Sequence, residues 1–192
     1  MDPRIELFIG PMFSNKTTQM FNRIKSFSYG NNSKKSIILK WDMDLRNGET
    51  QNIIKTHDGK EMSCIRVNKD LLLLNYDLLN EYGVIGIDEG HFFENLVVGC
   101  EKLCNEYNKI IIVTGLSGDF KREPFEEISK LIPKCDKIKN LTAVCTVCSK
   151  KASFSYKNDC GDQEKIIEVG GKEKYMPLCR QCYNNQKKLK IK

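Results

Sequence analysis

The sequence predicts an α/β domain, in which helices flank a mainly parallel sheet, followed by a small C-terminal module. Two observations support this. Short apolar runs alternate with amphipathic stretches through the first two thirds of the chain, and such alternation favours a parallel sheet with helices on both faces. The composition changes near Asn140, after which cysteine pairs appear and long apolar runs are few. We therefore expect a core over residues 1–140 and a second module over residues 141–192.

The expected strands are short continuous apolar runs, as fully buried strands are. They cover residues 5–9, 36–39, 84–87 and 110–113. Helical spacing of apolar residues covers residues 16–27, 71–79 and 95–107. In folds of this class the functional loops gather at the carboxyl ends of the strands, so candidate site residues are expected there.

The length and charge of the chain, and its lack of long apolar runs, limit the class of protein. The chain has 192 residues, enough for one domain and an appendage, and a formal net charge of +6. The charge suits an anionic ligand such as a nucleotide; it does not require nucleic acid, because much of the excess lies in the lysine-rich tail, residues 187–192. No apolar run is long enough for a membrane helix, and the first residues are not a signal peptide. We expect a cytoplasmic protein without a membrane partner.

A phosphate-binding loop is indicated between the first expected strand and the first expected helix. It reads Gly10, Pro11, Met12, Phe13, Ser14, Asn15, Lys16 and Thr17, close to the pattern G-x-x-x-x-G-K-[ST]. In that pattern backbone N–H groups surround phosphate, the lysine reaches the β- and γ-phosphates, and the hydroxyl binds Mg²⁺. Asn15 stands where the pattern has glycine, but asparagine tolerates left-handed backbone well, so we expect the loop to keep its shape. The alternative is a strand-to-helix turn that matches by chance.

Two carboxylates, Asp88 and Glu89, follow the expected strand over residues 84–87. In a protein with a phosphate loop, this is the position of the acid that holds Mg²⁺ directly or through water, a role that fits Asp88. Glu89 fits a general base that takes the proton of the phosphoryl acceptor. The alternative interpretation is a strand that runs into a solvated acidic turn.

The C-terminal module contains two C-x-x-C pairs, formed by Cys145, Cys148, Cys179 and Cys182. Such pairs, in a chain without a secretion signal, indicate a structural Zn²⁺ site with all four ligands from protein. Zinc ribbons also bind nucleic acid, which is a second hypothesis. Only Phe154 and Tyr156 offer an aromatic surface for it, so no nucleic-acid partner is expected.

Taken together, these motifs resemble the type II thymidine kinases, the cytosolic cellular and poxvirus group, from about Leu7 to Tyr183. The matching segments are the phosphate loop, Asp44-Leu45-Arg46, Thr56-His57-Asp58, Asp88 to Phe93, Gly115 to Phe125, Leu141 to Cys145 and Gly170 to Tyr175. The resemblance implies a P-loop α/β core with a zinc and lasso module. It also implies transfer of phosphate from ATP to the 5′-hydroxyl of thymidine or deoxyuridine, a homotetramer, and feedback inhibition by thymidine triphosphate.

The resemblance also implies roles for individual residues. Glu89 would be the catalytic base. ATP would be bound by the loop residues Gly10 to Thr17 and by Asp44, Leu45, Arg46, Asp88, Glu89, Gly90 and His91, with Mg²⁺ on Thr17 and Asp88. Thymidine would contact Met12, Leu116, Phe120, Phe125, Ser155, Ile166, Ile167, Glu168, Val169, Gly170 and Tyr175. The lasso, about Ile166 to Tyr175, would cover the base.

Three positions depart from the family pattern: Asn15 in the phosphate loop, Ser117 where aspartate is common, and Glu168 where a small apolar residue is usual. The change at Asn15 suggests an alternative, a catalytically weakened nucleotide-binding protein of the same fold. The retained Lys16, Thr17, Asp88 and Glu89 favour the active kinase.

Overall fold

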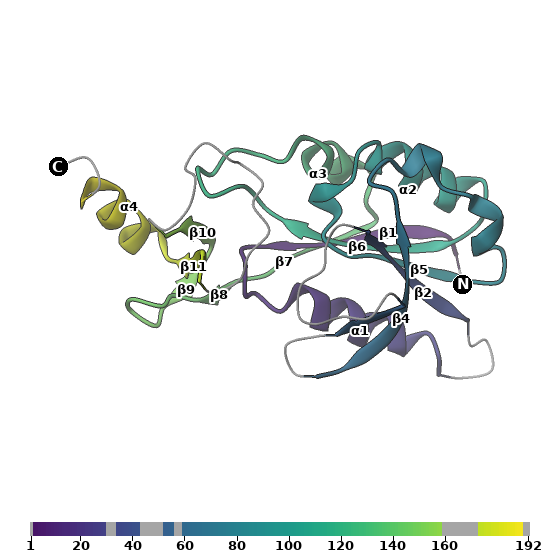
Figure 1. The fold of residues 1–192 in the computed structure, drawn as a ribbon, viewed down its shortest axis with the longest axis horizontal. Coiled ribbons are helices and arrows are strands. Elements are labelled where there is room, and N and C mark those ends of the chain that lie inside the picture. The colour runs from purple at the N-terminus through teal and green to yellow at the C-terminus, as the bar shows by residue number, and fades with distance from the viewer. Residues whose placement is uncertain (1, 30–33, 43–51, 56–58, 159–172, 190–192) are drawn as a thin grey trace.

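The computed structural model describes residues 2–29, 34–42, 52–55, 59–158 and 173–189 (Figure 1). A central sheet has the strand order β3-β4-β2-β5-β6-β1-β7. Its strands are β1 (Arg4–Gly10), β2 (Ser36–Trp41), β3 (Ile53–Lys55), β4 (Glu61–Val67), β5 (Val84–Ile87), β6 (Ile110–Leu116) and β7 (Lys137–Asn140). All paired neighbours run parallel except β3 and β4, which run antiparallel. The predicted α/β class is confirmed.

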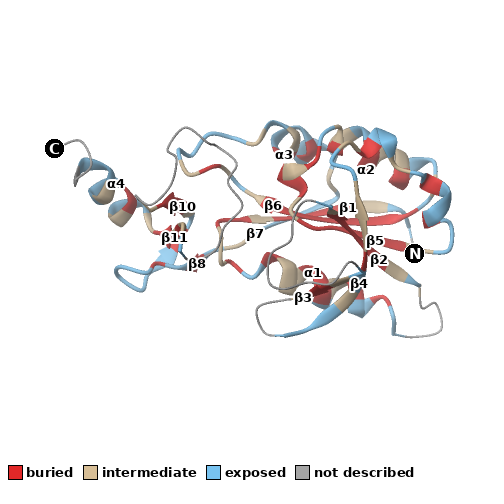
Figure 2. Cartoon of the chain, viewed as in Figure 1, coloured by how far each residue is buried: buried red, intermediate tan, exposed pale blue. Residues whose placement is uncertain are grey.

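The central strands are the most apolar segments of the sheet. In β6, the aliphatic residues Ile110 to Val113 are fully buried, as are Val84, Ile85 and Ile87 of β5. β-Branched residues pack well on a pleated surface that is covered on both faces, which is why these short runs form strands. Figure 2 shows the buried residues concentrated along this sheet.

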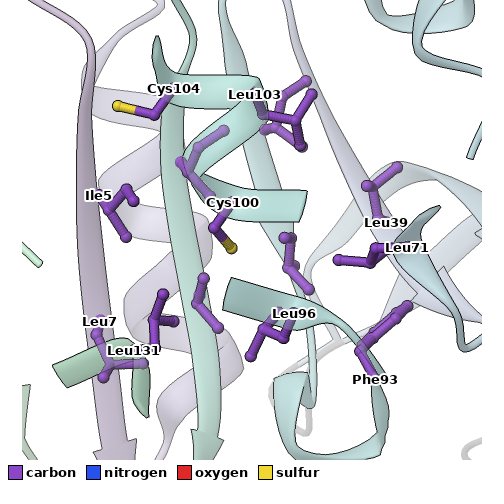
Figure 3. Packing of buried hydrophobic residues seen from close by; sticks show 14 of the residues in the cluster. Ile5, Leu7, Leu39, Leu71, Phe93, Leu96, Cys100, Leu103, Cys104 and Leu131 are labelled. Atoms are coloured by element: carbon purple, nitrogen blue, oxygen red, sulfur yellow. The ribbon is translucent and has the colours of Figure 1, made fainter. Parts of the chain in front are cut away.

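Helices cover both faces of the sheet. The helix α1 (Lys16–Ser26) lies on one face, where Met20, Phe21 and Ile24 pack in a cluster with residues of β1, β2 and β6. The helices α2 (Leu96–Asn105) and α3 (Glu126–Leu131) lie on the other face (Figure 1). Figure 3 shows their side of the core, in which Leu96, Cys100 and Leu131 pack with residues of several strands.

The helix expected over residues 71–79 is wrong: the structure has two short 3-10 turns there, η2 (Leu71–Leu73) and η3 (Tyr76–Leu79). The Asp70 carboxylate accepts a hydrogen bond from the Leu72 N–H at 2.9 Å, and the Asn75 side chain accepts one from the Asp77 N–H at 3.2 Å. Such local bonds compete with a continuous helical ladder, and the chain turns at each of them. Among the described residues, the other 3-10 turns are η4 (Gly90–Phe92) and η5 (Ile132–Lys134).

The described residues 141–158 and 173–189, here called the cysteine module, follow β7. They form the strands β8 (Ala143–Val144), β9 (Lys151–Ala152), β10 (Phe154–Lys157) and β11 (Tyr175–Leu178) and the helix α4 (Arg180–Leu189). β8 pairs with β9 and β10 pairs with β11, both antiparallel. The module has its own small apolar cluster and lies at one end of the sheet (Figure 1). None of the described helices is both long and apolar enough to cross a membrane.

Candidate active site

The phosphate loop joins β1 to α1, as predicted. Asn15 has φ 60° and ψ 32°, in the left-handed region, and Phe13 is also left-handed with φ 63°. The Asn15 carbonyl accepts the Gln19 N–H at 3.0 Å, so the helix begins directly at the loop. The first turn of α1 carries no acidic residue, which leaves its positive N-terminus suited to an anion.

Close packing inside the loop explains two of its residues. A Cβ on Gly10 would lie 2.6 Å from the Leu141 carbonyl oxygen and 2.7 Å from the Ser14 Oγ, so only glycine fits there. The Lys16 side chain is buried, and its ammonium donates to the Pro11 carbonyl at 2.9 Å. The loop therefore lies against the first residue of the cysteine module and carries the lysine charge within it.

The acidic end of β5 meets the phosphate loop. Thr17 Oγ1 donates to Asp88 Oδ1 at 3.0 Å, and Thr114 Oγ1 donates to the same oxygen at 2.8 Å. Asp88 is 4% exposed. A hydroxyl and a carboxylate at this separation offer the oxygen ligands that Mg²⁺ uses in proteins. Three elements, α1, β5 and β6, thus converge on one carboxylate.

Glu89 follows in an unusual conformation, with φ 53° and ψ 50°. Its N–H donates to Thr114 Oγ1 at 3.1 Å, so Thr114 holds both acidic residues. A left-handed residue other than glycine costs of order 1–3 kcal/mol, and such strain is concentrated at functional sites. Sequence analysis missed Thr114. The feature that could have indicated it is a hydroxyl residue directly after the aliphatic run of β6, at the carboxyl end of a buried strand.

Gly90 and His91 continue from Glu89 into η4. A Cβ on Gly90 would lie 2.7 Å from Val113 Cγ1, so glycine is needed for η4 to pack on β6. The buried His91 ring accepts the Leu116 N–H at Nδ1 at 3.3 Å, while Glu89 Oε2 lies 3.5 Å from the same nitrogen. Nδ1 can serve only one of these partners at a time: without a proton it accepts the Leu116 N–H, and with a proton it would instead donate to the Glu89 carboxylate.

The end of β6 and the loop after it contain three of the residues expected to contact thymidine, Leu116, Phe120 and Phe125. The His91 ring centroid lies 4.8 Å from that of Phe125, and the Leu116 N–H bonds to His91, so both residues adjoin the acidic end of β5. The Phe120 ring lies 5.1 Å from the Lys157 ammonium of β10. Lys157 is 2% exposed and was missed by sequence analysis, which treats lysines as surface residues.

The cysteine module contacts the phosphate loop. The Met12 N–H of the phosphate loop donates to Ser155 Oγ of β10 at 3.0 Å, which joins two residues expected at the thymidine site. Tyr175 is buried on β11 and is paired in register with Lys157. The other expected site residues, Asp44, Leu45, Arg46, Ile166, Ile167, Glu168, Val169 and Gly170, lie outside the described residues, as do Thr56, His57 and Asp58.

The four paired cysteines form one cluster in space. The ligand atoms of Cys145, Cys148, Cys179 and Cys182 all lie within 4.8 Å of one another. The Cys148 and Cys179 sulfurs are 3.6 Å apart. Zn–S bonds of about 2.3 Å in a tetrahedron require sulfur separations of about 3.8 Å, so the cluster fits Zn²⁺.

The surroundings lower the thiol pKa of Cys145 and Cys179 and raise that of Cys182. Burial raises the pKa of the Cys145 thiol, but N–H donors from Cys179, Val147 and Cys148 outweigh it and bring that pKa to about 6. Contact with the Cys179 sulfur raises the pKa of Cys182 to about 12. A bound dication would hold all four as thiolates, because its charge offsets their repulsion.

The strand order, the loop after β1 and the acidic end of β5 define an α/β protein of the P-loop class. A family model for thymidine kinase matches residues 3–183. A thymidine kinase of Amsacta moorei entomopoxvirus is 44% identical over 187 residues, which cover 94% of this chain and 98% of that protein. The thymidine kinase of raccoon poxvirus is 40% identical over 182 residues, with 95% and 97% covered, and that of vaccinia virus (strain Western Reserve) is 38% identical over 179 residues, with 93% and 96% covered. The chain belongs to the thymidine kinase family.

Proposed function

We propose that this chain is a kinase that transfers the γ-phosphoryl group of ATP to the 5′-hydroxyl of thymidine or deoxyuridine. The observation that carries the proposal is the contact between the phosphate loop and the acidic strand end, the bond of 3.0 Å from Thr17 Oγ1 to Asp88 Oδ1. In a member of the thymidine kinase family, this contact supports an ATP site and a nucleoside site that meet at the end of β5.

ATP would bind with its phosphates against the N–H groups of residues 10–17, at the N-terminus of α1. Lys16 would turn its ammonium from the Pro11 carbonyl to the β- and γ-phosphates. Thr17 and Asp88 would hold Mg²⁺, which neutralises phosphate charge when bound. Asp44, Leu45 and Arg46, outside the described residues, would complete the ATP site, as the resemblance implies, and Gly90 and His91 would flank it.

Glu89 would act as the general base. Its carboxylate takes the proton of the 5′-hydroxyl while that oxygen bonds to the γ-phosphorus, and the bond from phosphorus to the bridging oxygen breaks to release ADP. The Thr114 hydroxyl accepts the Glu89 N–H and donates to Asp88, so the base and the metal-holding acid keep a fixed relation. Such positioning is the main contribution of protein to phosphoryl transfer.

The nucleoside pocket would be formed by three segments. Met12, Leu116, Phe120 and Phe125 would wall the thymine ring, beside Ser155 and Tyr175, and the lasso residues Ile166, Ile167, Glu168, Val169 and Gly170 would cover it. The bond of 3.0 Å from the Met12 N–H to Ser155 Oγ supports a wall shared by the phosphate loop and β10. A closed pocket with hydrogen bonds discriminates strongly, because a mismatched base leaves buried polar groups unpaired.

Further parts of the proposal rest on the cysteine cluster, on the change of composition near Asn140 and on family membership. They are structural Zn²⁺ in the cysteine cluster, a homotetramer, feedback inhibition by thymidine triphosphate, a cytoplasmic location, and a boundary between core and module at Asn140. The weakened nucleotide-binding protein has no observation in its favour, because Asn15 holds a left-handed conformation like the one expected of glycine.

The test is a kinase assay with γ-labelled ATP, Mg²⁺ and a set of nucleosides, with chromatographic identification of the product. We expect thymidine 5′-monophosphate at a rate well above that of deoxycytidine phosphorylation. Tight thymidine binding without label transfer would support the weakened binding protein instead. Failure to bind or phosphorylate thymidine would contradict the proposal.

A further inference from the structure

We propose that Tyr183 is a positioning residue that fixes the thymidine-binding loop from the cysteine module. The identity of the nucleoside rests on the proposed function, whereas the hold on the loop rests on the geometry alone. Tyr183 lies in α4, directly after the zinc-ligand candidate Cys182, and no role was expected for it from the sequence.

The Tyr183 hydroxyl donates a hydrogen bond to the Phe120 carbonyl at 2.5 Å, across 63 positions of the sequence. Tyr183 is 3% exposed, and its own N–H donates to the Cys179 carbonyl at 2.9 Å. The tyrosine is buried and Phe120 is half-buried, so breaking the bond leaves the Tyr183 hydroxyl without this partner in a site with little water. The bond therefore restrains Phe120 firmly.

The Tyr183 ring is also held on several sides. The Arg122 guanidinium of the same loop lies 4.6 Å from the ring centroid. The rings of Phe154 and Tyr156 on β10 lie 5.7 Å and 5.5 Å from it. The hydroxyl thus points at the loop from a fixed ring, and two loop residues, Phe120 and Arg122, contact one side chain of the module. In Figure 1 the loop after β6 extends toward β10.

Hydrogen bonds within the loop keep the turn around Phe120 rigid. Asp119 Oδ1 accepts the N–H groups of Lys121 and Glu123, each at 2.8 Å, and the Asp119 N–H donates to the Glu123 carbonyl at 2.9 Å. These bonds close a tight turn around Phe120. A turn that is internally rigid and fixed at one carbonyl holds the Phe120 ring in one place, which is what a wall of the thymine pocket requires.

Because Tyr183 adjoins the second cysteine pair, the same contact links metal binding to nucleoside binding. A dication on Cys179 and Cys182 would order the start of α4, and with it the hydroxyl that bonds to Phe120. The effect would be on thymidine rather than ATP, since the phosphate loop reaches the module through Ser155 and Leu141, which are different residues.

The test compares Tyr183→Phe with a matched control, Tyr76→Phe. In the control, the deleted hydroxyl also donates to a backbone carbonyl, that of Leu71, at 3.0 Å, but in the core between η2 and η3. Hydrogen–deuterium exchange of the ligand-free protein is followed in residues 116–125, and KM is measured for thymidine and for ATP. Melting temperatures and zinc content are recorded for both variants.

We expect Tyr183→Phe to exchange about 10-fold faster in residues 116–125 and to raise KM for thymidine about 5- to 10-fold, with KM for ATP unchanged. Tyr76→Phe should lower the melting temperature by about as much as Tyr183→Phe does. It should change neither the exchange rate of residues 116–125 nor KM for thymidine. Unchanged exchange in the loop, or equal effects of the two variants, would overturn the inference. If Tyr183→Phe exchanges faster in this loop but the wild-type protein does not phosphorylate thymidine, the hold on the loop is supported and only the proposed function is contradicted.

Discussion

The left-handed backbone at Asn15 predicts a specific order of stabilities when this residue is replaced. With φ 60° and ψ 32°, any Cβ at this position is crowded, which costs roughly 1–2 kcal/mol for most residues and less for asparagine. Glycine avoids that cost but loses about 0.5–1 kcal/mol more backbone entropy on folding than alanine. Asn15→Gly should therefore change the free energy of unfolding little, and Asn15→Ala should be less stable than Asn15→Gly by about 1 kcal/mol.

The matched control is Asn22, an exposed residue within α1. There the helical backbone favours alanine over glycine by about 1 kcal/mol, so Asn22→Ala should be more stable than Asn22→Gly. The two positions should show opposite orders in urea unfolding. If alanine were also the better residue at position 15, the left-handed conformation and the argument built on it would be wrong.

The same series tests whether asparagine is compatible with catalysis. Because Asn15 and glycine share one backbone shape, Asn15→Gly should change kcat/KM for ATP by no more than about 3-fold, and Asn15→Ala should lower it further. A rise of about 100-fold in the glycine variant would mean that the asparagine side chain obstructs the phosphates, contrary to this account.

Three further predictions concern other contacts. Burial raises the pKa of Glu6, but the hydrogen bonds and charges of Arg23 and Arg4 together outweigh it and lower that pKa. The stabilising effect of Glu6 is therefore present above about pH 4.5 and is lost as the pH falls. Glu6→Gln should lower the free energy of unfolding by roughly 1–3 kcal/mol at pH 7 and flatten its dependence on acid, as urea titrations would show. Thr114→Val should reduce kcat by about 10-fold with a smaller change in KM for ATP, and an unchanged kcat would contradict its bridging role. Cys145→Ser should lower zinc content by atomic absorption and reduce the melting temperature, whereas full zinc occupancy would refute the four-cysteine site.

Much of the fold could be predicted because local patterns agree with the final packing. The continuous apolar run Ile110 to Val113 favours a strand buried in the centre of the sheet. The pattern from Gly10 to Thr17 is typical of a loop that joins a strand to a helix. The expected helix over residues 71–79 failed because Asp70 and Asn75 bond to nearby N–H groups, which apolar spacing does not reveal.

The site was less predictable because its contacts join distant segments. Asp88 and Glu89 could be proposed from their place after a strand. The hydroxyl of Thr114 that bonds to both of them depends on the parallel register of β5 and β6, which the sequence does not contain. The bond from Tyr183 to Phe120 likewise requires the placement of the cysteine module against the core. Tertiary packing, and not local preference, decides such pairs.

The central claim is that Glu89 is the base that accepts the 5′-hydroxyl proton of thymidine. The most direct measurement compares single-turnover thymidine phosphorylation by Glu89→Gln and by the control Glu126→Gln, whose residue is 79% exposed on α3. We expect the Glu89 variant to lose at least about 100-fold in rate while it still binds ATP and thymidine, and the control to match the wild type. Near-normal turnover in Glu89→Gln would contradict the account.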